Sequence, residues 1–126
     1  MTEMASLCFA AGGALIKWLG VTSFTLVWAH SVQKTRWEED WQIKPTGLQL
    51  VAARVQGNGA GMEPPAGARF EHGIWHWVPD LQILNEISLR RSDAVEDWQI
   101  CVKGQCQPLA QIVPKEADPV VLSPCF

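Results

Sequence analysis

The stretch from Phe24 to Ile43, FTLVWAHSVQKTRWEEDWQI, decides the fold because it predicts a β-hairpin with one apolar and one polar face. Placing the loop at Gln33 to Arg36 sets the register of the two strands. The expected pairs are Val32 with Trp37, His30 with Glu39, Trp28 with Trp41 and Leu26 with Ile43. Because side chains alternate between the faces of a strand, one face then collects Phe24, Leu26, Trp28, Val32, Trp37, Trp41 and Ile43. The hairpin is therefore expected to cover a core with one face and to expose Thr25, Ser31, Glu38, Asp40, Gln42 and Lys44.

His30 and Glu39 interrupt the apolar face of this predicted hairpin. Two ionisable groups on a buried face are unfavourable unless they pair, so they are candidates for binding a ligand, a partner or a proton. The alternative is a cross-strand pair that only fixes the register; both interpretations stay open. Ser31 is adjacent to His30 and so points to the opposite face, which argues against a nucleophile and base pair.

Size and charge limit the classes of function. The chain has 126 residues, of which 48% are hydrophobic, and seven are tryptophans, enough for one domain with a real core. Its formal net charge is -3, with no basic stripe, so nucleic acid is not expected as a partner. The glycine-rich run Gly57 to Gly61 is followed by Met62-Glu63-Pro64-Pro65 rather than by a phosphate-binding helix, and predicts a flexible turn. We expect no enzyme activity and no cofactor.

The N-terminal region is apolar and allows two interpretations. Two short strands, Leu7 to Ala11 and Ala14 to Leu19, fit the sequence, with a turn at Gly12-Gly13. A membrane or signal segment also has adequate length, but Lys17 lies in the middle of the run and Glu3 replaces the usual positive start.

The remaining sequence predicts further short strands. They lie at Leu48 to Val55, Gly73 to Val78, Leu81 to Leu89, Asp97 to Val102 and Gln105 to Leu109. With eight or nine short strands and no helical period, the expected fold is all-β, a single-domain antiparallel β-sandwich or barrel built from hairpins. We place the β-rich domain at residues 1–113 and a C-terminal tail, packed back on the domain, at residues 114–126.

The four cysteines suggest two pairs. A two-residue turn at Lys103-Gly104 places Cys101 directly opposite Cys106, and Cys8 and Cys125 then remain near the chain ends. Free thiols or a zinc site are alternatives, although the spacing is not typical of zinc and we assign no metal ligands. Disulfides would favour a periplasmic or membrane-associated location, and free thiols a cytoplasmic one.

A second aromatic cluster lies at Trp75, His76 and Trp77, with the two tryptophans on one face of a strand and His76 on the other. His72 and His76 would lie about 13 Å apart on a strand, too far to share a metal ion. An exposed tryptophan here would mark a contact site. The complete set of candidate ligand-binding or partner-binding residues is His30, Ser31, Lys34, Glu38, Glu39, Trp41, Asn58, Glu63, Trp75 and Trp77.

Three segments resemble a bacterial family, the domain-of-unknown-function family 1850. They are AHSVQKTRWEEDWQI at 29–43, GNGAGMEPP at 57–65 and DWQICVKGQC at 97–106, and the likeness spans roughly Leu7 to Leu109. Its best marker is the block of His30, Ser31 and Val32, followed by Glu39. No catalytic residues are established for the family, so the resemblance implies none here.

The resemblance implies a small β-rich protein with a role in transport. Family members are often encoded beside fused permeases of tripartite ATP-independent periplasmic (TRAP) transporters whose binding protein is of the TAXI type. We therefore expect an accessory protein, near the membrane, that contacts the permease or its solute-binding protein through the His30 hairpin tip and the Gly57 to Pro65 loop. The alternative is a module that binds a small carboxylate in a tryptophan-lined cleft, oriented by His30 and Glu39.

Overall fold

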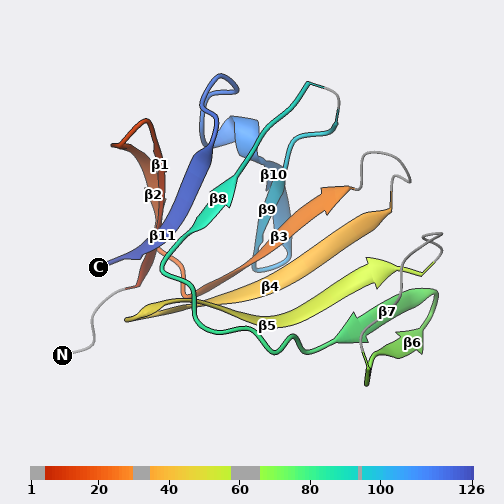
Figure 1. Cartoon of the computed structure of the whole chain (residues 1–126). Helices are drawn as coiled ribbons and strands as arrows, with labels where there is room; N and C mark the ends of the chain where they lie inside the picture. The colour runs from red at the N-terminus through yellow and green to blue at the C-terminus, as the bar shows by residue number, and fades with distance from the viewer. Residues whose placement is uncertain (1–4, 30–34, 58–65, 94) are drawn as a thin grey trace.

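Two antiparallel sheets form a β-sandwich in the computed structural model (Figure 1), which describes residues 5–29, 35–57, 66–93 and 95–126. The four-stranded sheet has the order β2-β1-β11-β8, and the seven-stranded sheet has the order β10-β9-β3-β4-β5-β7-β6. The strands are β1 (Ser6–Ala11), β2 (Ala14–Leu19), β3 (Ser23–Ala29), β4 (Arg36–Lys44), β5 (Gly47–Gln56), β6 (Arg69–Glu71), β7 (Ile74–Trp77), β8 (Ile87–Leu89), β9 (Gln99–Val102), β10 (Gln105–Pro108) and β11 (Val120–Cys125), with a short 3-10 helix η1 (Leu109–Gln111). The all-β prediction is confirmed, as a sandwich rather than a barrel.

The core lies between the two sheets and is made of inward-facing residues of β1, β3, β4, β5, β8, β9 and β11. The four-stranded sheet contributes Leu7, Phe9, Leu89, Val120 and Leu122, and the seven-stranded sheet contributes Phe24, Leu26, Trp41, Ile43, Leu48, Leu50 and Ile100. Leu109 and Val113 close one side of the core. Strand alternation explains this set, because the residues between them face outward.

The β3–β4 hairpin has the predicted faces but a different register. Trp28 lies opposite Trp37 instead of Trp41, so the pairing is shifted by four residues, and residues 30–35 connect Ala29 to Arg36. An even shift keeps every side chain on its face, which is why the division into core and solvent side survives. The observed register stacks the rings of Trp28 and Trp37, with centroids 5.0 Å apart and planes at 6°.

The predicted pair of His30 and Glu39 is therefore wrong. Glu39 lies opposite Leu26 on β3 and opposite Ala53 on β5. His30 itself lies outside the described residues. Glu39 therefore lies on the inner face with aliphatic residues, rather than a histidine, at the paired positions of both neighbouring strands.

The N-terminal region forms the predicted hairpin of β1 and β2. No helix among the described residues is long and apolar enough to cross a membrane. Eleven strands are present in the described part of the chain instead of eight or nine, because β6 is very short and β11 lies in the segment expected to be a tail. Of the segment from Leu81 to Leu89, only β8 is a strand, preceded by a single bridge between Leu84 and Leu48.

The cysteines form the two disulfides that the sequence favoured. Cys8–Cys125 joins β1 to β11, and Cys101–Cys106 joins directly opposed residues of β9 and β10. Lys103 and Gly104, with φ of 53° and 80°, make the tight turn between those two strands. Both cysteine pairs are therefore disulfides rather than the alternative free thiols or zinc ligands.

Candidate functional site

A row of four tryptophans lies on the inner face of the seven-stranded sheet and continues beyond the core. Its ring centroids are 5.9 Å apart between Trp98 and Trp28, 5.0 Å between Trp28 and Trp37, and 6.1 Å between Trp37 and Trp77. Trp98 packs against the core, whereas the other three lie outside the core cluster. All four are half-buried. We call these four residues the tryptophan row.

The row lies where the larger sheet extends past the smaller one. In Figure 1 the right-hand part of β3, β4 and β5 projects away from the four-stranded sheet, and Trp28 and Trp37 belong to the strand ends in that part. These ends adjoin the segments 30–34 and 58–65, which lie outside the described residues.

Glu39 is the charged residue next to this row. It lies between Trp37 and Trp41 along β4, and the residues across the sheet from it are Leu26, Ala53 and, one strand further, Trp77. Burial raises the pKa of the Glu39 carboxyl above its ordinary value, although the indoles of Trp41 and Trp28 favour the ionised form. Among the described residues, no Lys, Arg or His forms an ion pair with Glu39.

The two tryptophans that flank Glu39 along β4 have indole nitrogens without a partner among the described residues. The Nε1 atoms of Trp37 and Trp41 are fully buried and form no hydrogen bond within the described part of the chain. The Trp41 indole influences the Glu39 carboxylate without reaching hydrogen-bond geometry. An unpaired donor of this kind is unusual in a protein interior and carries an energetic penalty.

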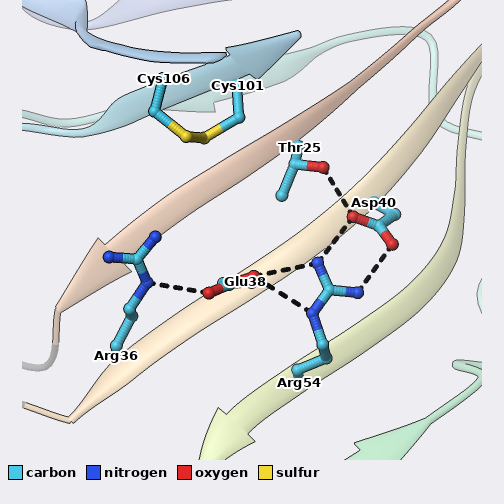
Figure 2. Close-up of a disulfide and its surroundings, with 7 residues drawn as sticks. All are labelled: Thr25, Arg36, Glu38, Asp40, Arg54, Cys101 and Cys106. Atoms are coloured by element: carbon cyan, nitrogen blue, oxygen red, sulfur yellow. Dashed lines mark hydrogen bonds and ion pairs between the residues drawn. A yellow bond between two sulfur atoms is a disulfide. The ribbon is translucent and has the colours of Figure 1, made fainter. Parts of the chain in front are cut away.

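The outer face of the same sheet carries a separate, fully paired network, centred on Arg54 (Figure 2). The Arg54 guanidinium donates to both oxygens of Asp40, at 2.7 and 2.9 Å, and to Oε1 of Glu38, at 3.0 and 3.1 Å. Arg36 donates to Glu38 at 2.8 Å, and the Thr25 hydroxyl donates to Asp40 at 2.7 Å. Each carboxylate therefore already has cationic or hydroxyl donors.

The protonation of this network follows from its pairing. Burial raises the pKa of Glu38, but hydrogen bonds and charge from Arg36 and Arg54 outweigh that effect and leave the pKa below its ordinary value. The hydrogen bond from Arg54 holds the pKa of Asp40 low as well. In return, Asp40 raises the pKa of Arg54. All three groups stay charged, so the network acts as a clamp between β4 and β5.

An open hollow of about 460 Å³ lies over this clamp and is lined on another side by the Cys101–Cys106 disulfide and Lys103. Figure 2 shows the disulfide above β3, on the same side as the clamp. Because Arg36 and Arg54 are held by Glu38 and Asp40, the hollow offers few free charges for a ligand.

A second clamp holds Trp98 in place. Arg91 pairs with Asp97 at 2.8 Å, with side chains only 5% and 14% exposed, and donates to the carbonyls of Pro114 and Ala117 at 2.6 and 3.1 Å. The Trp98 indole donates to the carbonyl of Arg90 at 2.8 Å. These bonds tie the segment before β9 to the segment before β11.

The structure separates the predicted site residues into three groups. His30, Ser31, Lys34, Asn58 and Glu63 lie outside the described residues. Glu38 belongs to the outer clamp, and Trp41 is 4% exposed in the core. Glu39 and Trp77 come together at the tryptophan row, while Trp75 contacts Phe70 with centroids 4.9 Å apart.

Sequence reasoning missed three members of the row, namely Trp28, Trp37 and Trp98. Alternation placed Trp28 and Trp37 on the correct face, but the expected register kept them apart. Trp98 precedes β9, and no local signal brings it to β3. Among the described residues, no group of His, Cys, Asp or Glu side chains has an arrangement suited to a metal ion.

Comparison with known proteins identifies the family. The model of the domain of unknown function DUF1850 matches residues 24–109, which include the seven-stranded sheet except for its first residue, Ser23, and the whole tryptophan row. No curated protein and no solved structure matches the chain. Since the family model covers well over half of the sequence, the chain belongs to the DUF1850 family, as the resemblance predicted.

Proposed function

We propose that this member of the DUF1850 family is a non-enzymatic accessory protein of a TRAP-type transport system with a TAXI-type binding protein. In this proposal it acts by contact with the permease or the solute-binding protein. The transport context rests on the family resemblance. The observation that supports a contact role is the tryptophan row at the end of the larger sheet.

The row has the character of a contact surface. Tryptophan offers a large apolar area together with a polar N–H group, and it is enriched among residues that dominate the energy of protein interfaces. Trp28, Trp37 and Trp77 are half-buried and lie outside the core cluster, so a partner could bury them further. The outer face is a weaker candidate, because its charges already pair with one another.

The location that we propose is the periplasmic side of the membrane. Two disulfides favour an oxidising compartment, and they are consistent with contact to a periplasmic binding protein. The proposal involves no catalytic step, since Arg54 holds the two outer carboxylates as a structural clamp.

The direct test is binding between purified proteins. We would measure the affinity of the oxidised protein for the TAXI-type binding protein and for the permease in nanodiscs. Trp77→Ala is expected to weaken binding by at least about tenfold, as for a residue at the centre of an interface. Trp18→Ala is the matched control, because Trp18 is 60% exposed on β2 and lies outside the family match. No binding to either partner, or equal losses in both variants, would contradict the proposal.

A module that binds a small carboxylate is the second candidate. The tryptophan row supports an aromatic binding site, which is the observation in its favour. Glu39 argues against this ligand class, because an ionised carboxylate beside the row would repel another. Quenching of tryptophan fluorescence by acetate or butyrate, absent with sodium chloride, would favour this candidate over the first.

A further inference from the structure

Glu39 is a carboxyl group in an aromatic and aliphatic environment. Its neighbours on the inner face are Trp37 and Trp41 along β4, Leu26 and Trp28 on β3, Ala53 and Val55 on β5, and Trp77 on β7. Ala53, the residue directly opposite Glu39 on β5, has the smallest side chain among these neighbours. Glu39 is only half-buried, which keeps it within reach of solvent.

No group on these described strands neutralises Glu39. The inner-face neighbours on β3, β5 and β7 carry no titratable side chain. The neighbouring strand positions do carry charged or titratable residues, but these alternate with the inner-face residues and therefore project from the outer face. They are Glu38 and Asp40 on β4, Arg54 on β5 and His76 on β7. A desolvated carboxylate without a counter-charge is energetically unfavourable, and this makes Glu39 a candidate functional residue.

We propose that Glu39 and the tryptophan row bind a small organic ammonium ion. This inference deepens the proposed function, because it names the ligand class of the same end of the sheet. The faces of tryptophan rings attract cations through their quadrupole, and an adjacent carboxylate supplies the opposite charge. An alkylammonium group also presents carbon atoms that pack against indole rings.

Other ligand classes fit this arrangement less well. Ca²⁺ and Mg²⁺ require about six or more oxygen ligands, and Glu39 is the single carboxylate on the described inner face at this point. A carboxylate would meet the like charge of Glu39. The ammonium class is the one in which both the rings and the carboxylate contribute favourably.

The test is a titration of the oxidised full chain with n-butylammonium and tetramethylammonium chloride, followed by tryptophan fluorescence. Sodium chloride at equal ionic strength, n-butanol and sodium butyrate are the reference titrants. We expect saturable binding of the two ammonium probes and of none of the reference titrants. Glu39→Gln should weaken this binding at least about tenfold. Glu86→Gln, at an exposed position near β8, is the matched control and should leave binding unchanged. Butylammonium can donate a hydrogen bond to Glu39, whereas tetramethylammonium has no N–H group. Binding of tetramethylammonium therefore reports the attraction of the rings and of the carboxylate charge without that hydrogen bond.

A second measurement uses the unmodified protein and does not depend on folding of the variant. Butylammonium should lower the pKa of Glu39, followed through the ¹³C shift of its carboxyl group, and binding should weaken as the pH falls and Glu39 becomes protonated. An unchanged Glu39 pKa, equal binding by wild type and Glu39→Gln, or preference for butyrate would overturn the inference. If the protein binds ammonium ions but neither the permease nor the binding protein, only the transport proposal is contradicted. If it binds one of these proteins but no ammonium ion, only this inference is contradicted.

Discussion

At the scale of one residue, the half-buried carboxyl group of Glu39 predicts how the free energy of unfolding depends on pH. Burial raises its pKa in the folded protein, so the folded state disfavours the ionised carboxylate, and the contribution of Glu39 to stability falls as the pH rises through the acid range. Glu39→Gln cannot ionise and should be more stable than wild type by up to about 1 kcal/mol near neutral pH. The gain should shrink toward about pH 4, where wild-type Glu39 is protonated. Urea unfolding at both pH values checks this, and a pH-independent difference would contradict it.

Arg54 has the opposite effect, because its two carboxylate partners have lowered pKa values. Groups of this kind stabilise the fold above their unfolded-state pKa, and the contribution is lost as the pH falls through the folded-state value. Arg54→Met should therefore lower the free energy of unfolding by about 1–2 kcal/mol near neutral pH, and by less in acid.

The exposed pair of Arg69 and Glu71 provides the control for Arg54. Its two atoms are 3.0 Å apart, similar to the Arg54 contacts, but Arg69 is 71% exposed whereas Arg54 is 24% exposed. Arg69→Met should change stability little, since exposed ion pairs contribute little. Equal effects of the two substitutions in chemical denaturation would show that the clamp has no special role.

At the scale of elements, sequence patterns predicted faces better than registers. Alternation placed Trp28 and Trp37 on the inner face, but an even slip leaves this pattern unchanged. Where a two-residue turn defined the pairing, as at Lys103-Gly104, the register and the Cys101–Cys106 pair were predicted correctly. The connection at residues 30–35 has no such turn signal, so the sequence left its length open.

The same limitation explains which parts of the candidate site could be predicted. Glu39 was recognised because a carboxylate on an apolar face is visible in the alternation itself. The tryptophan row was not recognised, because its members come from β3, β4, β7 and the segment before β9. They come into contact only once the order of the strands in the sheet is known. β11 was missed because Pro119 directly precedes it and Pro124 lies within it.

The observed register makes a prediction about the β3–β4 hairpin. Trp28 and Trp37 stack across the two strands, so a double-mutant cycle with Trp28→Ala and Trp37→Ala should give a coupling of about 0.5–1.5 kcal/mol. A cycle that combines Trp28→Ala with Trp18→Ala, on the exposed strand β2, should be additive. Coupling no larger in the first cycle than in the second would contradict the observed pairing of the hairpin.

At the scale of the molecule, the sandwich is built from the segment that matches the family model together with strands near the two ends of the chain. The family match at residues 24–109 contains the larger sheet and β8, whereas β1, β2 and β11 lie outside it. β1 and β11 nevertheless contribute fully buried residues to the core between the two sheets. These residues are Leu7, Phe9 and Leu122. The chain ends therefore complete the core on which the position of the tryptophan row depends.

This architecture predicts unequal contributions from the two disulfides. Cys8–Cys125 closes a loop with a sequence separation of 117 and holds the first strand to the last, whereas Cys101–Cys106 has a separation of 5. In the chain-entropy model, removing the first as Cys8→Ser with Cys125→Ser should lower stability by about 5 kcal/mol, and removing the second by about 2 kcal/mol.

The measurement is equilibrium unfolding of both double variants beside the oxidised wild type. The Cys8–Cys125 variant should also loosen β1 and β11 selectively, because these strands carry the ends of the chain, and hydrogen exchange of their amides reports this loosening. Since β11 also pairs with β8, faster exchange should extend to Ile87–Leu89 while β4 and β5 stay protected. Equal losses of stability in the two variants, or exchange that rises first in the larger sheet, would mean that the small sheet is held by its packing against the core rather than by the bond between the chain ends.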